Sequence, residues 1–370
     1  MMLTIHAGLH KTGSTAIQIA LAGMSKDELQ GIEYRGHKTS AENDGFLREA
    51  PMGFTVPRDA DNSRTVRSAV DARHVVLSHE RFLGYPLHPD VEDMYCQAAN
   101  HAAAMRDYFQ EKTPFQIVVY LRPQHLWLES VYNQYIKNRP FAEALDSTVF
   151  AERTLDAPYF HLTRLINDLK EQVGSDRLIV RPYRSGINIT ADFLTVLGIP
   201  TPERLINPQP ENRSLTPEQV VLRQRIWEAM GGSHWIHWAQ SLDPGAPESA
   251  RGRSFFPEET QARLIQVAAT DWRDLTKAVA DTHLAEPHLF ESLARDAEHA
   301  QVKPYVGSLD AVSCEDEAVR LLIEALPYVA THPRNLPKRA KTLVTRVRAK
   351  AQSDPKDLPR AAIANLRRKN

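Results

Sequence analysis

The sequence predicts an α/β protein in which helices cover both faces of a central, mostly parallel sheet, followed by a helical C-terminal extension. Strand-like and helix-like segments alternate over the first half of the chain, which is the pattern of a parallel sheet. Several strand-like segments are continuous apolar runs, as expected for strands buried on both faces. From about Thr216 the pattern becomes helical. We expect one domain over residues 1–300 and a basic helical extension over residues 301–370.

The predicted strands follow one another at regular intervals. The first is a short buried run that leads into a glycine-containing loop, and the second is bounded by Gly31 and Gly36. The third has a core of Val and Leu residues, and the fourth is the clearest strand and ends before Pro123. In order, the five segments are residues 2–7, 31–36, 73–82, 115–122 and 176–183.

Helices are predicted between these strands. Ile17, Leu21 and Met24 recur at helical spacing after a start near Ser14. The other segments with a helical pattern are residues 94–109, 124–138, 161–172 and 189–200, the last of them ended by Gly198 and Pro200.

The chain carries its charge unevenly. Its net charge is −1, but residues 334–370 hold twelve Lys or Arg and only two acids, Asp354 and Asp357. Such a tail is suited to an anionic membrane surface or an acidic partner, but a solvated helical or disordered tail is the simpler interpretation. The stretch "KRAKTLVTRVRAK" has no aromatic residue on which bases could stack, so we expect no specific nucleic-acid binding.

Cysteine content and hydropathy favour a cytoplasmic protein. Cys96 and Cys314 are the only cysteines, which excludes a disulfide framework and a cysteine zinc site. The N-terminus lacks a signal-peptide pattern, and no stretch approaches the roughly 18 apolar residues of a membrane span. Contact with the inner membrane face through the tail is compatible with this location.

The loop "HAGLHKTGSTAIQ" runs from the first strand into the first helix, as phosphate-binding loops do. Gly8 and Gly13 have the spacing of the nucleotide triphosphatase pattern, but Ser14 occupies the position of its lysine. Lys11 lies before Gly13 instead. The strand "IVVYLR" ends in Arg122, which is the wrong charge for holding magnesium. We therefore expect no metal ion.

The segment "HKTGST" resembles the 5′-phosphosulfate loop of sulfotransferases that use PAPS, 3′-phosphoadenosine 5′-phosphosulfate. That family has lysine, a small residue, glycine and two hydroxyl residues, which here are Lys11, Thr12, Gly13, Ser14 and Thr15. The resemblance implies a P-loop nucleotide hydrolase-like sulfotransferase fold with PAPS as the donor. A helix-capping loop with an incidental lysine is the simpler alternative.

A second segment, "YLRPQHLWLESVYNQYIK", resembles the 3′-phosphate site of the same family. The family has an arginine at a strand end and a serine eight positions later, which here are Arg122 and Ser130. Arginine offers a rigid fork of donors to phosphate. Lys137 follows two turns later on the same predicted helix face and adds charge.

The resemblance as a whole covers about residues 1–280 and favours a bacterial branch of the family. Tyr183 matches a tyrosine that lies near the adenine, although a core tyrosine fits equally, and "NRSLTPE" and "ATDWRDL" resemble later segments. The arginine-lysine-glycine segment of many animal members is missing, which leaves the other 3′-phosphate contacts open.

The resemblance implies sulfuryl transfer to an acceptor hydroxyl, most simply of a carbohydrate or glycoconjugate. Lys11 would neutralise the leaving oxygen between phosphorus and sulfur. Glu80, or else His79, would take the proton of the acceptor, because both follow a strand at the carboxyl edge of the sheet.

Two other functions and one further cluster stay open. A P-loop kinase would need magnesium, and a non-catalytic relative would bind nucleotide without turnover. In "SHWIHW", His234 and His237 lack a third metal ligand, whereas Trp235 and Trp238 either stack on a sugar or pack internally.

Overall fold

The computed structural model describes residues 2–36, 74–80, 82–84, 94–111, 113–137, 145–184, 186–206, 217 and 254–305. The chain divides into two compact units. The first comprises Met1–Val131, Thr148–Asn212 and Glu259–Val302, and the second comprises Tyr132–Ser147, Arg213–Glu258 and Lys303–Asn370. The predicted boundary at residue 300 stays a prediction.

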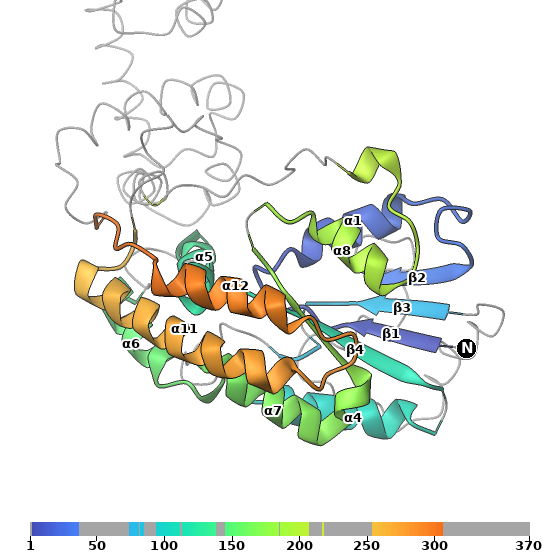
Figure 1. Ribbon diagram of the computed structural model, residues 1–370, viewed down its shortest axis with the longest axis horizontal. Helices are drawn as coiled ribbons and strands as arrows, with labels where there is room; N and C mark the ends of the chain where they lie inside the picture. Colours follow the sequence, from blue (N-terminus) through green and yellow to red (C-terminus); the bar gives the residue numbers. More distant parts are fainter. Residues whose placement is uncertain are drawn as a thin grey trace, which may run out of the picture. The chain divides into compact units, whose positions relative to one another are not determined.

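A five-stranded sheet forms the centre of the first unit (Figure 1). Its strand order is β2-β3-β1-β4-β5, and every neighbouring pair is parallel. The strands are β1 (Met2–His6), β2 (Ile32–Gly36), β3 (His74–Ser78), β4 (Phe115–Leu121) and β5 (Leu178–Pro182). The prediction of an α/β protein with a central parallel sheet is confirmed. All seven residues of β4 are buried, as a strand covered on both faces requires.

Helices flank both faces of this sheet (Figure 1). On one face lie α1 (Ser14–Gly23) and α8 (Ile189–Val196). On the side of the other face lie α4 (Ala98–Phe109), α7 (Leu162–Val173), α11 (Glu258–Val279) and α12 (Pro287–Glu298). The chain also forms α5 (Gln124–Lys137), α6 (Ser147–Leu155) and the short 3₁₀ helices η6 (Pro158–Phe160), η7 (Ser175–Arg177) and η8 (Glu203–Leu205).

The helix expected to begin at residue 94 begins at Ala98 instead. Residues 94–97 form turns, and Tyr95 has a positive φ of 52° that no right-handed helix accommodates. This difference matters for the site, because the turn directs the Tyr95 side chain toward the loop after β1.

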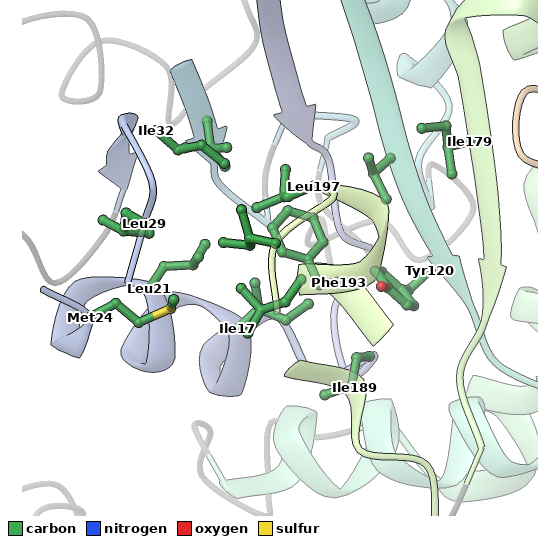
Figure 2. Packing of buried hydrophobic residues seen from close by; sticks show 14 residues of the cluster. Ile17, Leu21, Met24, Leu29, Ile32, Tyr120, Ile179, Ile189, Phe193 and Leu197 are labelled. Atoms are coloured by element: carbon green, nitrogen blue, oxygen red, sulfur yellow. The ribbon is translucent and has the colours of Figure 1, made fainter. Parts of the chain in front are cut away.

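The core between the sheet and its first helical face consists of large apolar side chains (Figure 2). Ile17 and Leu21 of α1 meet Phe193 of α8 over Tyr120 and Ile179 of the sheet. Each fully buried side chain of this size contributes roughly 1.5–3 kcal/mol relative to its exposed form. The packing therefore fixes α1, and with it the loop that precedes α1, against the carboxyl edge of the sheet.

Candidate functional site

The loop of residues 7–13 joins β1 to α1 at the carboxyl edge, where ligands of open α/β sheets bind. Thr12 Oγ1 donates to the Leu9 carbonyl at 2.6 Å and closes the loop into a turn. Lys11 has a φ of 65°, in the left-handed region. This conformation costs a lysine about 1 kcal/mol, so the surrounding structure holds the loop where its own sequence does not favour it.

The N-terminus of α1 has the properties of an anion site. Gly13 is its N-cap residue, no side chain caps the helix, and the first turn contains no acid. Ser14 is only 3% exposed, and its Oγ has no hydrogen-bond partner among the described residues. The Thr15 side chain is exposed at the same helix end. Uncapped N–H groups, the helix dipole and a buried hydroxyl together favour an anion there.

Arg122, the first residue after β4, lies beside this loop. Its Nη1 donates to Ser130 Oγ at 2.8 Å and to the Lys11 carbonyl at 3.4 Å. Its guanidinium carbon is 5.5 Å from the ring centroid of Tyr183. Burial lowers the pKa of Arg122, and Tyr183 and Glu129 partly oppose that shift. The two segments singled out in the sequence therefore meet at one place.

Tyr183 lies at the same edge because it follows β5, and its N–H donates to the Leu121 carbonyl at 2.6 Å. Its ring borders the loop. A Cβ added to Gly13 would lie 3.0 Å from Cε2 of Tyr183 and 3.0 Å from Cδ1 of Ile189. Because Gly13 also has a φ of 85°, glycine is required at this position for two separate reasons.

The Lys11 ammonium lies among charged neighbours. Burial lowers the pKa of Lys11, the Glu80 carboxylate partly raises it, and Arg122 lowers it further. A partly buried lysine between a carboxylate and a guanidinium is typical of binding and catalytic sites. At neutral pH such a lysine is suited to neutralising an anion that enters the loop.

The two candidate bases after β3 have different neighbours. The His79 ring lies 5.7 Å from that of Phe82, centroid to centroid. The Glu80 carboxylate instead interacts with Lys11, and its Oε1 lies 3.9 Å from Nε2 of His10. Glu80 thus interacts with two residues of the loop, Lys11 and His10.

Two buried aromatic residues that sequence reasoning missed fix the loop backbone. Tyr95 Oη accepts a hydrogen bond from the His10 N–H at 2.8 Å, and Trp127 Nε1 donates to the His10 carbonyl at 2.8 Å. Trp127 lies in the first turn of the helix that follows Arg122, so its position in the sequence could have indicated that it lies close to the site. Nothing local in the sequence singles out Tyr95.

A buried polar cluster lies where β1 and β3 end. His6 Nδ1 is 2.8 Å from Ser78 Oγ, and Gln18 Nε2 donates to the same oxygen at 3.3 Å. Tyr34 also hydrogen-bonds Ser78. Burial lowers the pKa of His6 to about 3, so the ring is neutral near pH 7. A Cβ on Gly8 would lie 3.0 Å from His6 Nε2 and 2.4 Å from Ser14 Oγ.

Several predicted features lie outside the described residues. These are the cluster of His234, Trp235, His237 and Trp238, Cys314 and the basic tail. Lys137 is the last residue of α5, and its side chain is likewise not described. In the described ranges, no group of three or more His, Cys, Asp or Glu could hold a metal ion. No helix in that part of the chain is long and apolar enough to cross a membrane.

Comparison with known proteins leaves the family open. No family model matches the chain. The chain is similar to an uncharacterized protein of Archaeoglobus fulgidus, with 28% identity over 158 residues. This match covers 41% of the present chain and 42% of the archaeal protein. The class that the fold defines is an α/β protein with a central parallel sheet flanked by helices.

Proposed function

We propose that the protein is a PAPS-dependent sulfotransferase that transfers a sulfuryl group to a hydroxyl of a carbohydrate or glycoconjugate. The observation that carries the proposal is the position of Arg122, whose Nη1 donates to both Ser130 Oγ and the Lys11 carbonyl. Two sets of anion-binding groups thus share one sheet edge. A nucleotide with two separate anionic groups, one at each end of its ribose, suits this arrangement.

In this proposal the loop and the start of α1 hold the 5′-phosphosulfate. The N–H groups after Gly13 and the hydroxyls of Ser14 and Thr15 donate to its oxygens, and Lys11 neutralises its charge. The unpartnered Ser14 hydroxyl supports this role. Thr12 contributes through its backbone, because its hydroxyl already donates to Leu9.

The 3′-phosphate is assigned to Arg122 and Ser130. A guanidinium that is largely shielded from water forms strong charge-assisted hydrogen bonds with phosphate. The Ser130 hydroxyl, 2.8 Å from Arg122 Nη1, adds a donor when it turns from the Leu126 carbonyl, to which it donates at 3.3 Å. Tyr183 lies over the same guanidinium and beside the loop, so its ring is available to the adenine.

The transfer step then follows from the charges of the site. A bond forms between the acceptor oxygen and sulfur while the bond from sulfur to the phosphate oxygen breaks. Lys11 neutralises the charge that develops on the leaving oxygen. Glu80 takes the acceptor proton, and His79 is the second candidate for that role. No step requires a metal ion.

Donor recognition is tested by calorimetry with nucleotides that differ only in one group. We expect the wild-type protein to bind 3′-phosphoadenosine 5′-phosphate roughly 10–100-fold more tightly than AMP, since charged hydrogen bonds contribute about 1.5–3 kcal/mol. Arg122→Ala should remove this preference. Arg273→Ala is the matched control, because Arg273 pairs with Glu298 at the surface of the same unit. Equal binding of both nucleotides by the wild-type protein would refute the proposal.

A transfer assay separates the proposed function from its alternatives. Sulfuryl transfer to a panel of sugars should proceed in the presence of a magnesium chelator, whereas a kinase would stop. A non-catalytic relative would bind the nucleotide and transfer nothing. A cytoplasmic location and contact of the basic tail with an anionic membrane or acidic partner remain proposals from the sequence.

A further inference from the structure

His10 directly precedes Lys11 and has no role in the chemistry described so far. Its Nδ1 is 3.0 Å from Tyr95 Oη, and its backbone N–H donates to the same oxygen at 2.8 Å. Its other ring nitrogen, Nε2, lies 3.9 Å from Glu80 Oε1. The imidazole therefore lies between a buried phenol and the carboxylate assigned as the base.

The hydrogen bonds of the Tyr95 hydroxyl determine which ring nitrogen of His10 carries the proton. The phenol has one proton, and its oxygen already accepts the His10 N–H. Tyr95 is only 2% exposed, so water does not take this proton, and the acceptor within hydrogen-bond distance is Nδ1 of His10. Burial raises the pKa of Tyr95, so the phenol keeps its proton. Neutral His10 then has its own proton on Nε2, the nitrogen that faces Glu80.

We propose that His10 is a positioning residue for Glu80, with its tautomer set by Tyr95 and its Nε2–H directed at the carboxylate. The inference rests on the proposed function. A separation of 3.9 Å is longer than a hydrogen bond, but it is within reach of a small rotation of the half-exposed Glu80 side chain.

The charged surroundings explain why such a donor is useful. Among the described residues, the titratable groups that interact with Glu80 are His10, Lys11 and Tyr95. Lys11 attracts the carboxylate, and a close ion pair between them would occupy both the base and the cation that the leaving oxygen needs. A neutral N–H donor at His10 orients Glu80 without adding charge. His10 keeps its proton throughout, while the acceptor proton goes to Glu80.

Two substitutions of His10 distinguish the role of Nδ1, which contacts Tyr95, from the role of Nε2, which faces Glu80. The amide of His10→Asn reaches the position of Nδ1 and can still bond Tyr95, but leaves Glu80 without its donor. The amide of His10→Gln reaches the position of Nε2 and can donate to Glu80. We expect kcat to fall about 10–100-fold in His10→Asn, by analogy with the loss of residues that orient catalytic ligands. His10→Gln should recover most of this loss.

Binding measurements show whether the effect is confined to positioning. Both variants should bind 3′-phosphoadenosine 5′-phosphate within about twofold of the wild-type affinity, and KM for the donor should stay unchanged while kcat differs. An equal loss of kcat in both variants, or no loss in His10→Asn, would overturn the inference.

The tautomer itself can be measured without any turnover. We expect ¹⁵N NMR of the full-length protein, with the His10 signals assigned from the His10→Gln spectrum, to show the proton on Nε2 near pH 7. Tyr95→Phe should populate both tautomers. A proton on Nδ1 in the wild-type protein would refute the role of His10 and leave the proposed function standing. Failure to prefer the 3′-phosphorylated nucleotide over AMP would refute the function, whatever the tautomer.

Discussion

Lys11 has a backbone conformation that few lysines adopt, and four neighbouring groups hold it there. Thr12 closes the turn from within the loop, Trp127 and Tyr95 bind the backbone of His10, and Arg122 donates to the Lys11 carbonyl. Strain that is retained by so many partners is characteristic of functional sites. These contacts fix the shape of the loop, and under the proposed function a loop fixed in advance loses less entropy on binding the nucleotide.

Gly13→Ala tests this shape at a single residue. The new Cβ would lie 3.0 Å from both Tyr183 and Ile189, at a φ of 85°. We expect the free energy of unfolding to fall by about 1–3 kcal/mol, and nucleotide affinity to fall at least tenfold because the helix end shifts. Denaturant unfolding and calorimetry measure the two effects.

Gly23→Ala provides the control at the other end of α1. No atom lies within 4 Å of a Cβ added there, so the substitution should be neutral or slightly stabilising. Equal effects of the two substitutions would show that helix propensity, and not the shape of the loop, determines the result.

At the scale of elements, the sequence predicted all five strands and most helices, because continuous apolar runs and helical spacing are local signals. The resemblance to a 3′-phosphate site also implied that Arg122 and Ser130 lie together, and Arg122 Nη1 donates to Ser130 Oγ at 2.8 Å. The sequence did not predict the contact of Tyr95 with His10. These residues are 85 positions apart in the sequence. Tyr95 reaches His10 because it lies in a turn where the sequence pattern predicted a helix.

A buried ion pair links α8 to the sheet, in addition to the apolar core. Arg181 of β5 bonds Asp192 of α8, which also accepts a hydrogen bond from Tyr120 Oη at 2.6 Å. Glu286 is a second, more exposed partner of Arg181, at 2.8 Å. The Arg181 and Asp192 side chains are 7% and 16% exposed, so loss of one partner leaves a charge largely out of water.

We therefore expect Asp192→Ala to lower the free energy of unfolding by about 3 kcal/mol. Asp274→Ala is the matched control, since the partner of this exposed aspartate is Lys277 at 3.3 Å, and the change should stay within about 0.5 kcal/mol. Urea denaturation gives both values. A loss at position 192 no larger than that at position 274 would show that the apolar core alone holds α8.

At the scale of the whole unit, polar residues join segments that lie far apart in sequence. Asp271 of α11 accepts hydrogen bonds from the Leu162 N–H at 2.7 Å, at the start of α7, and from Gln124 Nε2 at 2.5 Å, at the start of α5. Trp272 Nε1 donates to the same glutamine at 2.8 Å. The sequence pattern "ATDWRDL" suggested a resemblance but not this role, because which helix end a carboxylate caps depends on tertiary packing.

The stability of the whole unit should also depend on pH through His6, in a direction that its burial determines. The pKa of His6 is about 3 in the folded protein and near 6.5 when unfolded, so between these values the unfolded chain binds one more proton. Stability from this residue is complete above pH 6.5 and is lost as the pH falls toward 3, by at most about 1.4 kcal/mol per pH unit.

His6→Asn isolates this contribution, because its amide nitrogen occupies the position of Nδ1 and can still bond Ser78. Urea unfolding at several pH values between 7 and 4 should give a shallower decline for the variant than for the wild-type protein. A residual slope is expected from His74 and His101, whose pKa values are also lowered by burial. Parallel curves for the two proteins would mean that His6 is protonated, or reaches water, in the folded state. The assignment of a neutral, buried His6 ring next to the loop of residues 7–13 would then be wrong.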